Sequence, residues 1–245
     1  MNNNTTDDFE ASLLSNDSKR KYMIHLFNRI ASRYDLIRLL VFLGHTSLWY
    51  RKALSDLELK SNDKVLDVGC GTGESTRYIK RLYPQVEIEG LDISSGMLEI
   101  ASKKDTQGHY FEGDVCNIPR PDGCYDLVLT CFTFRNFPDA ELALNEMMRI
   151  LRPGGRLLIL DHFYPQSPVW RIIYTFWMVK VAPKIAGLFI DDTKPYHYLA
   201  KSIIHQLKFV DFIQRLENKG LQVVASNLYS GGASGRLIAI CNKQS

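Results

Sequence analysis

Hydrophobic and polar positions in the first quarter of the chain follow a helical period. Between residues 19 and 57, apolar side chains recur at helical spacing at Ile24, Phe27, Ile30, Ala31, Leu36, Leu39, Leu40 and Leu43. We expect Gly44 to end one helix and Ser47 to cap the next, which runs through Leu54. Residues 1–18 are mostly polar, and we expect a flexible tail there.

Short apolar runs then alternate with helical segments. We expect strands over residues 64–68, 86–91, 110–113, 125–131 and 156–160, and helices over 75–82, 96–102 and 140–151. Such alternation with short connections predicts an α/β fold, a doubly wound and mostly parallel sheet with helices on both faces. Ligands of such sheets bind at the carboxyl ends of the strands, near the point where strand order reverses.

The alternation stops after the fifth strand. Residues 163–209 have a helical pattern, and we expect a helical cap inserted into a single domain of residues 19–245. A helix over 208–219 and strands over 221–227 and 236–241 are expected to follow.

Composition and charge narrow the class of protein. A chain of 245 residues with 45% hydrophobic and 23% charged residues suits one globular α/β domain. Its net charge of +3 is too small to argue for a nucleic-acid partner. The five cysteines lack the spacings of a disulfide framework or a zinc site, so we expect reduced thiols, no metal and a cytoplasmic protein. No uncharged stretch is long enough to span a bilayer.

A glycine-rich loop at residues 67–73 (DVGCGTG) joins the first strand to its helix. Gly69, Gly71 and Gly73 allow a tight turn and let a ligand lie against the backbone. Asp92 ends the next strand, 19 positions after Gly73 (92 − 73). A carboxylate there can accept hydrogen bonds from both hydroxyls of a ribose.

Two cofactor classes fit such a loop. The spacing G-x-G-x-G is one residue shorter than the dinucleotide fingerprint, and S-adenosylmethionine has no pyrophosphate to hold. We expect Asp67 to orient the loop amides and, directly or through water, to meet the positive amino-acid portion of S-adenosylmethionine. The loop therefore favours this cofactor over a dinucleotide.

A second acidic residue, Asp114, ends the third strand. It is placed to accept a hydrogen bond from the adenine amino group, while the Val115 amide faces a ring nitrogen and Ile93 and Met97 pack on the ring. The alternative for Asp92 and Asp114 is that each only caps the segment that follows. The loop and two carboxylates at successive strand ends together favour the cofactor site.

Several segments outside the loop share the motifs of one family. They are residues 27–35 (FNRIASRYD), 44–51 (GHTSLWYR), 132–136 (FTFRN), 151–157 (LRPGGRL) and 196–203 (YHYLAKSI). They resemble the C-methyltransferases of menaquinone and ubiquinone biosynthesis, whose similarity to this chain runs from about residue 27 to residue 229. The fourth segment is less specific, because many methyltransferases share it.

The resemblance implies a class I methyltransferase with a Rossmann-like fold. The enzyme would transfer a methyl group from S-adenosylmethionine to a ring carbon of a lipophilic, polyprenylated quinol. The resemblance places Thr72, Asp92, Asp114, Val115 and Cys131 at the cofactor. Peripheral contact with the membrane and a homodimer both stay open.

Three departures from the family pattern fall near the expected acceptor. Thr133 replaces the glycine of the motif F-G-x-R-N, and Asp161-His162 stands where family members usually carry Glu-Phe. Residues 231–236 (GGASGR) also differ from the family's usual ending. The departures therefore bear on the acceptor and not on the cofactor.

Four residues are candidates for the chemistry at the acceptor. A quinol carbon becomes nucleophilic when its neighbouring hydroxyl loses a proton, and a guanidinium beside that oxygen stabilises the phenolate. Arg135 is placed for this role, with Asn136 to orient the acceptor or the loop. Tyr34 is a candidate from the N-terminal helix, and His162 is the candidate general base. The structural alternatives are a surface ion pair for Arg135 and a core position for Tyr34.

Other functions keep the cofactor residues but change the acceptor. One is O- or N-methylation of another small aromatic compound, and another is a fold relative that holds S-adenosylmethionine structurally. Adenine methylation by base flipping is disfavoured, because such enzymes carry D/N-P-P-Y/F where this chain has CFTF. Protein methylation stays open, although no acidic substrate-binding pair stands out.

The cap contains an unusually aromatic stretch at residues 169–179 (VWRIIYTFWMV). No acidic residue occurs between Asp161 and Asp191, whereas Arg171, Lys180 and Lys184 are basic. Two interpretations stay open: a lid that receives a prenyl tail and touches anionic lipid, or a lid helix buried against the domain.

Overall fold

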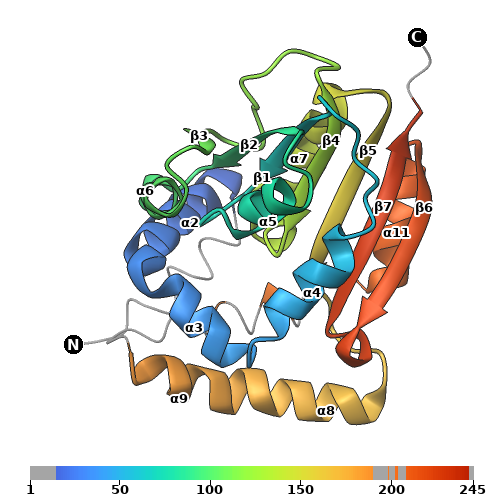
Figure 1. The fold of residues 1–245 in the computed structure, drawn as a ribbon. Coiled ribbons are helices and arrows are strands. Elements are labelled where there is room, and N and C mark those ends of the chain that lie inside the picture. Colours follow the sequence, from blue (N-terminus) through green and yellow to red (C-terminus); the bar gives the residue numbers. More distant parts are fainter. Residues whose placement is uncertain (1–14, 190–197, 199–201, 204–207, 243–245) are drawn as a thin grey trace.

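A seven-stranded sheet forms the centre of the protein (Figure 1). The computed structural model describes residues 15–189, 198, 202–203 and 208–242. The strands are β1 (Lys64–Val68), β2 (Glu87–Asp92), β3 (His109–Glu112), β4 (Tyr125–Cys131), β5 (Leu151–His162), β6 (Leu221–Tyr229) and β7 (Ser234–Cys241). Their spatial order is β3-β2-β1-β4-β5-β7-β6.

The sheet is mostly parallel. Strands β1 to β5 pair in parallel, and β7 runs antiparallel between β5 and β6. Strand β1 pairs with both β2 and β4, so the strand order reverses beside β1 and opens a crevice at the carboxyl ends. The predicted doubly wound α/β fold is confirmed.

Helices cover both faces of the sheet. They include α4 (His45–Leu54), α5 (Glu74–Leu82), α6 (Ser95–Lys104), α7 (Ala140–Ile150) and α11 (Phe209–Asn218). Successive side chains of a strand point to opposite faces, so Val128 of β4 joins the core beside α7 and α11, whereas Leu127 and Leu129 join the core beside α4 and α5. All seven residues of β4 are buried.

The N-terminal helices α2 (Asn16–Ile30) and α3 (Tyr34–Val41) lie at the strand ends, joined by the short turn η1 (Ala31–Arg33). Helix α2 begins three residues before the predicted start, because the Ser15 hydroxyl accepts a hydrogen bond from the amide of Ser18. Residues 16–18 are therefore helical and not part of a flexible tail. Residues 1–14 lie outside the described part of the chain.

The boundaries predicted for the next helix and for the fifth strand were also wrong. Helix α4 begins at His45 with Gly44 as its N-cap at φ 74°, so Ser47 lies inside the helix and does not cap it. Strand β5 begins at Leu151 and not at Arg156. Residues 152–155, which we expected to separate the helix from the strand, form an irregularity in its pairing with β4.

The predicted cap begins with a helical rod along one edge of the molecule (Figure 1). It consists of α8 (Pro168–Phe176), a π-helical turn (Trp177–Val181) and α9 (Ala182–Gly187). The Trp177 indole nitrogen donates to the Val41 carbonyl oxygen at 2.8 Å and ties the rod to α3. Most of residues 190–207 lie outside the described part of the chain. Within the described part, no helix is both long and apolar enough to cross a membrane.

Candidate active site

A large cavity lies at the crevice beside β1. The ends of strands β1 to β4 form one side of it, and α2 and α3 form the other. It encloses about 1360 Å³ of space free of protein atoms, part of it continuous with solvent. Small-molecule sites typically measure about 300–1,000 Å³, so the cavity has room for a nucleoside and a second molecule.

The glycine loop borders this cavity. Gly69, Gly71 and Gly73 have φ angles of 70°, 55° and 75°, which favour glycine. A side chain on Gly69 would collide with Thr133, and one on Gly73 would collide with Tyr110. A β-carbon on Gly71 would meet nothing within 4 Å, so open space lies beside the backbone there.

Asp92 holds the loop in position. Its Oδ2 accepts the amide of Gly71 at 2.8 Å, and its Oδ1 accepts the amide of Ser94 at 2.9 Å. The side chain also lines the cavity, and burial raises its pKa. Each carboxylate oxygen has a second lone pair, so bonding to the backbone leaves capacity for a ligand.

Asp114 lines the cavity at the end of the third strand's segment. Its Oδ1 accepts the amide of Cys116 at 2.9 Å, and its Oδ2 pairs with Nε of Arg20 from α2 at 2.6 Å. The cavity is also lined by the other expected cofactor neighbours Ile93, Met97, Val115 and Cys131. The ion pair with Arg20 was not predicted.

Thr72 lines the cavity and contacts α3. Its hydroxyl donates to Asp35 at 2.9 Å, and Asp35 also pairs with Lys104 of α6. The carboxylate thus connects the glycine loop to two helices.

Asp67 does not line the cavity. It is fully buried, and its Oδ2 accepts the hydroxyls of Ser75 at 2.6 Å and Thr76 at 2.7 Å. Its Oδ1 has no hydrogen-bond partner among the described residues. Burial raises the pKa of this carboxyl to about 6. The structure therefore places Asp67 against the start of α5, and any effect on a ligand must pass through the loop or water.

The rest of the cavity is largely apolar. Its lining includes Leu26, Phe27, Ile30, Val41, Phe42 and Phe132. The four residues that we expected near the acceptor, Tyr34, Arg135, Asn136 and His162, also line it. One cavity therefore joins the predicted cofactor residues, apart from Asp67 and Gly73, to the predicted acceptor residues.

Arg135 is held by a buried ion pair. Its Nη1 donates to Oδ1 of Asp161 at 2.5 Å, and its backbone amide donates to Oδ2 of the same residue at 3.1 Å. The Arg135 side chain is 6% exposed and that of Asp161 is 0% exposed. The partner is thus an interior carboxylate and not a surface one. Nε of Arg135 is buried and has no partner among the described residues.

The backbone just after β4 is strained. Phe132 has φ 61°, a left-handed conformation that costs a non-glycine residue about 1–2 kcal/mol. In this conformation its carbonyl oxygen accepts Nη1 of Arg135 at 2.5 Å, and its ring stacks on His162 with centroids 4.7 Å apart.

His162 lies in an aromatic environment at the end of β5. Its ring also stacks on Phe42 at 4.4 Å and meets the edge of Trp49 at 5.5 Å. Burial, and then the charge of Arg135, lower its pKa well below the usual value. The ring is therefore neutral near pH 7 and can accept a proton, although it is a weaker base than an exposed histidine.

Asn136 and Tyr34 are each fixed by neighbours. Oδ1 of Asn136 accepts the hydroxyl of Tyr198 at 3.1 Å, which ties the turn after β4 to the cap. Tyr34 meets the ring of Phe27 edge-on at 6.4 Å, and burial raises its pKa. Tyr34 is thus both a packed aromatic residue and part of the cavity wall.

Sequence comparison supplies close relatives. A model of the ubiE/COQ5 methyltransferase family matches residues 15–240. The demethylmenaquinone methyltransferase of Thermotoga maritima is 37% identical over 212 residues, which cover 86% of this chain and 92% of that protein. The ubiquinone/menaquinone biosynthesis C-methyltransferase UbiE of Haemophilus ducreyi is 29% identical over 228 residues, which cover 90% and 88% respectively.

Solved structures share the fold at lower sequence identity. An S-adenosylmethionine-dependent methyltransferase of Thermotoga maritima superposes with a TM-score of 0.63 at 21% identity, covering 89% of this chain and 99% of that one. One of Aquifex aeolicus has a TM-score of 0.59 at 19% identity, with 84% and 97% covered. The class I, Rossmann-like architecture is therefore confirmed.

Alanine at Gly69 and at Gly71 should have different effects. Both variants incur the left-handed penalty of about 1 kcal/mol in the free energy of unfolding. Gly69→Ala should be the less stable in urea denaturation, because its side chain collides with Thr133, and Thr133→Gly should restore part of the difference. Gly71→Ala should instead weaken S-adenosylmethionine binding at least tenfold by calorimetry. Equal unfolding midpoints for the two variants would contradict this assignment.

Asp67 should make stability depend on pH. Its folded-state pKa of about 6 lies above the ordinary 3.8, so the folded protein binds this proton more tightly. The stabilising contribution is present at low pH and is lost as the pH rises from about 4 through 6. Asp67→Asn should remove that loss, measured as urea unfolding free energy across this range. Glu87→Gln, at an exposed carboxyl, serves as the control, and an unchanged slope in Asp67→Asn would refute the argument.

Proposed function

Because the chain belongs to the ubiE/COQ5 methyltransferase family, we propose that it methylates a ring carbon of a demethylmenaquinol-type or related polyprenyl quinol in the cavity described above. The protein is an S-adenosylmethionine-dependent methyltransferase. One observation carries the proposal: a single cavity joins a nucleoside-sized region at the strand ends to an apolar region that contains the buried guanidinium of Arg135.

The residues at the strand ends fit S-adenosylmethionine. The backbone at Gly71 borders open space that any β-carbon would enter, and Asp92 is positioned beside it to accept ribose hydroxyls. Asp114 keeps acceptor capacity for the adenine amino group, with Met97 and Val115 as apolar neighbours. When bound, S-adenosylmethionine supplies an electrophilic methyl carbon.

Arg135 would stabilise the activated acceptor. A quinol carbon becomes nucleophilic as the adjacent hydroxyl loses its proton, and the guanidinium charge offsets the negative charge that forms on that oxygen. Asp161 and the Phe132 carbonyl hold Nη1 of the guanidinium, so its charge is fixed beside the cavity that Arg135 lines. Pre-positioned charges of this kind need no reorganisation when the reaction occurs.

His162 and Asn136 have supporting roles in this proposal. The imidazole, which burial keeps neutral and which lines the cavity, would take the hydroxyl proton. Asn136 holds the turn that carries Arg135 through its bond to Tyr198. The aromatic walls limit water around the phenolate and so strengthen its attraction to Arg135.

Arg135→Ala should abolish most of the methyl transfer while cofactor binding persists. Loss of one charge-stabilising donor typically lowers kcat by about 10²–10³-fold. The same change leaves Asp161 buried without its partner, at a cost of about 3–5 kcal/mol in stability. The double variant Arg135→Ala/Asp161→Asn removes that charge and should regain stability but not activity. Exposed Arg81→Ala is the matched control, and near-normal turnover in Arg135→Ala would refute the role.

The acceptor class can be tested directly with a panel of quinols. We expect a demethylmenaquinol with a short prenyl tail to gain one methyl group on a ring carbon, located by mass spectrometry and NMR. The ubiquinone-pathway analogue tests the breadth of the site, and generic phenols should react at least about tenfold more slowly. Methylation only at oxygen or nitrogen would contradict the proposal. S-adenosylmethionine binding without any methylated product would favour a structural use of the cofactor.

A further inference from the structure

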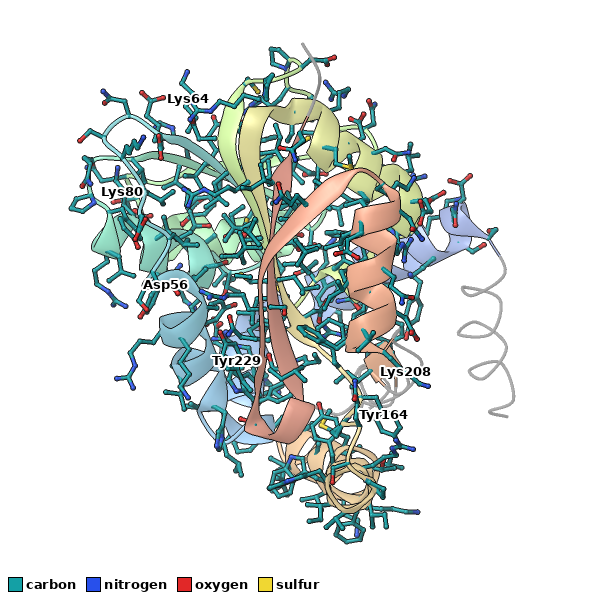
Figure 2. The ribbon with its side chains drawn as sticks, turned by 90° about the vertical axis from the view of Figure 1, so that its right-hand side faces the viewer. Asp56, Lys64, Lys80, Tyr164, Lys208 and Tyr229 are labelled. Atoms are coloured by element: carbon teal, nitrogen blue, oxygen red, sulfur yellow. The ribbon has the colours of Figure 1, made fainter. Side chains whose placement is uncertain are left out.

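One face of the cap rod carries large apolar side chains that point into solvent. They are Val169, Trp170, Ile172, Ile173 and Phe176 of α8, with exposures from 51% for Trp170 to 72% for Ile172. Leu188, directly after α9, is 79% exposed. Positions 169, 172, 173 and 176 follow helical spacing and form one stripe along α8. Figure 2 views the rod nearly end-on and shows side chains that project from it away from the sheet.

The opposite face of the rod is already packed. Met178, Ala182 and Ala186 are buried against Ile37 and Val41 of α3. The apolar stripe of an amphipathic helix normally faces the core, yet no residue of α8 is fully buried. Exposed apolar patches of this kind mark interaction surfaces.

The charged residues between positions 162 and 189 indicate what kind of partner fits this surface. Residues 162–189 contain no acidic side chain, and Arg171, Lys180 and Lys184 are basic. Lys180 and Lys184 are exposed and continue the stripe at four-residue steps after Phe176. An apolar stripe bordered by lysines is typical of helices that lie in the interface of an anionic membrane.

We propose that the outer face of α8 and α9 docks this enzyme onto an anionic phospholipid bilayer. The apolar stripe enters the boundary of the acyl chains, and Lys180 and Lys184 lie among the headgroups. This docking proposal rests on the proposed function. A polyprenyl quinol partitions into lipid, so the enzyme would meet its acceptor at the bilayer. A second copy of the chain fits less well, since a symmetric contact would bring like charges together with no acidic residue in 162–189 to offset them.

The surface lies close to the acceptor region. Val41 of α3 lines the cavity and also packs against the rod, so the rod and α3 are the layers between the docking face and the cavity. Tyr34 and Arg38 line the cavity from the same helix. Docking would therefore place the apolar part of the cavity beside the bilayer that holds the acceptor.

Vesicle co-sedimentation tests the docking surface. The wild-type protein should sediment at low salt with vesicles of phosphatidylcholine and phosphatidylglycerol, and less with phosphatidylcholine alone. Ile172→Glu/Phe176→Glu should lower partitioning at least tenfold. Lys180→Glu and Lys184→Glu should each lower it about fivefold or more, since one basic residue near the surface contributes about 1 kcal/mol. Leu142→Glu, on the exposed face of α7, is the matched control and should bind as the wild type does.

Activity on a short-tailed, water-soluble quinol separates docking from catalysis. Ile172→Glu/Phe176→Glu should keep this activity while losing turnover of a long-tailed quinol in vesicles. Wild-type protein that stays in the supernatant at low salt overturns the docking proposal, whether or not it methylates quinols. Sedimentation without quinol methylation would support docking and contradict the proposed function. A dimer that Ile172→Glu dissociates, with no vesicle binding, would instead identify an interface between copies.

Discussion

The buried ion pair between Arg135 and Asp161 is the interaction on which the apolar half of the cavity depends. Asp161 is the next-to-last residue of β5, and its carboxylate accepts both the guanidinium and the backbone amide of Arg135. It therefore fixes the turn after β4 as well as the charge that the turn carries. Because both side chains are buried, removal of one partner would leave the other uncompensated, whereas exposed pairs contribute little.

The same turn links the two halves of the cavity. The Thr133 hydroxyl donates to the carbonyl of Gly69 at 3.0 Å, so the turn after β4 rests on the glycine loop. Thr133 stands where the related motif has glycine, and the contact shows that the larger residue fills space above the loop. Phe132 places its ring on His162 through a strained backbone conformation. A shift in this turn would thus reach the cofactor region and the acceptor region together.

Polar bridges from the N-terminal helices complete the cavity. Arg20 of α2 pairs with Asp114, and Asn28 of the same helix accepts the hydroxyl of Ser94 at 2.7 Å. Asp35 of α3 accepts the hydroxyl of Thr72. Each bridge joins a helix before the sheet to a different strand end, so the N-terminal segment forms part of the site and does not merely precede the domain.

Local pattern determined the parts of this protein that depend on neighbouring residues. Strand β4 matched its predicted bounds, because its short, mainly apolar run (YDLVLTC) is typical of a strand buried on both faces. The glycine loop and Asp92 were predicted because the loop follows one strand and Asp92 ends the next, 19 positions after Gly73. The tertiary structure decided the pairings between distant segments. Asp161 pairs with Arg135, 26 positions away, only because β5 lies beside β4, and no local period reports the order of strands in a sheet. Periodicity likewise predicted the helical cap but not which face of α8 would remain exposed, since that depends on where α3 packs.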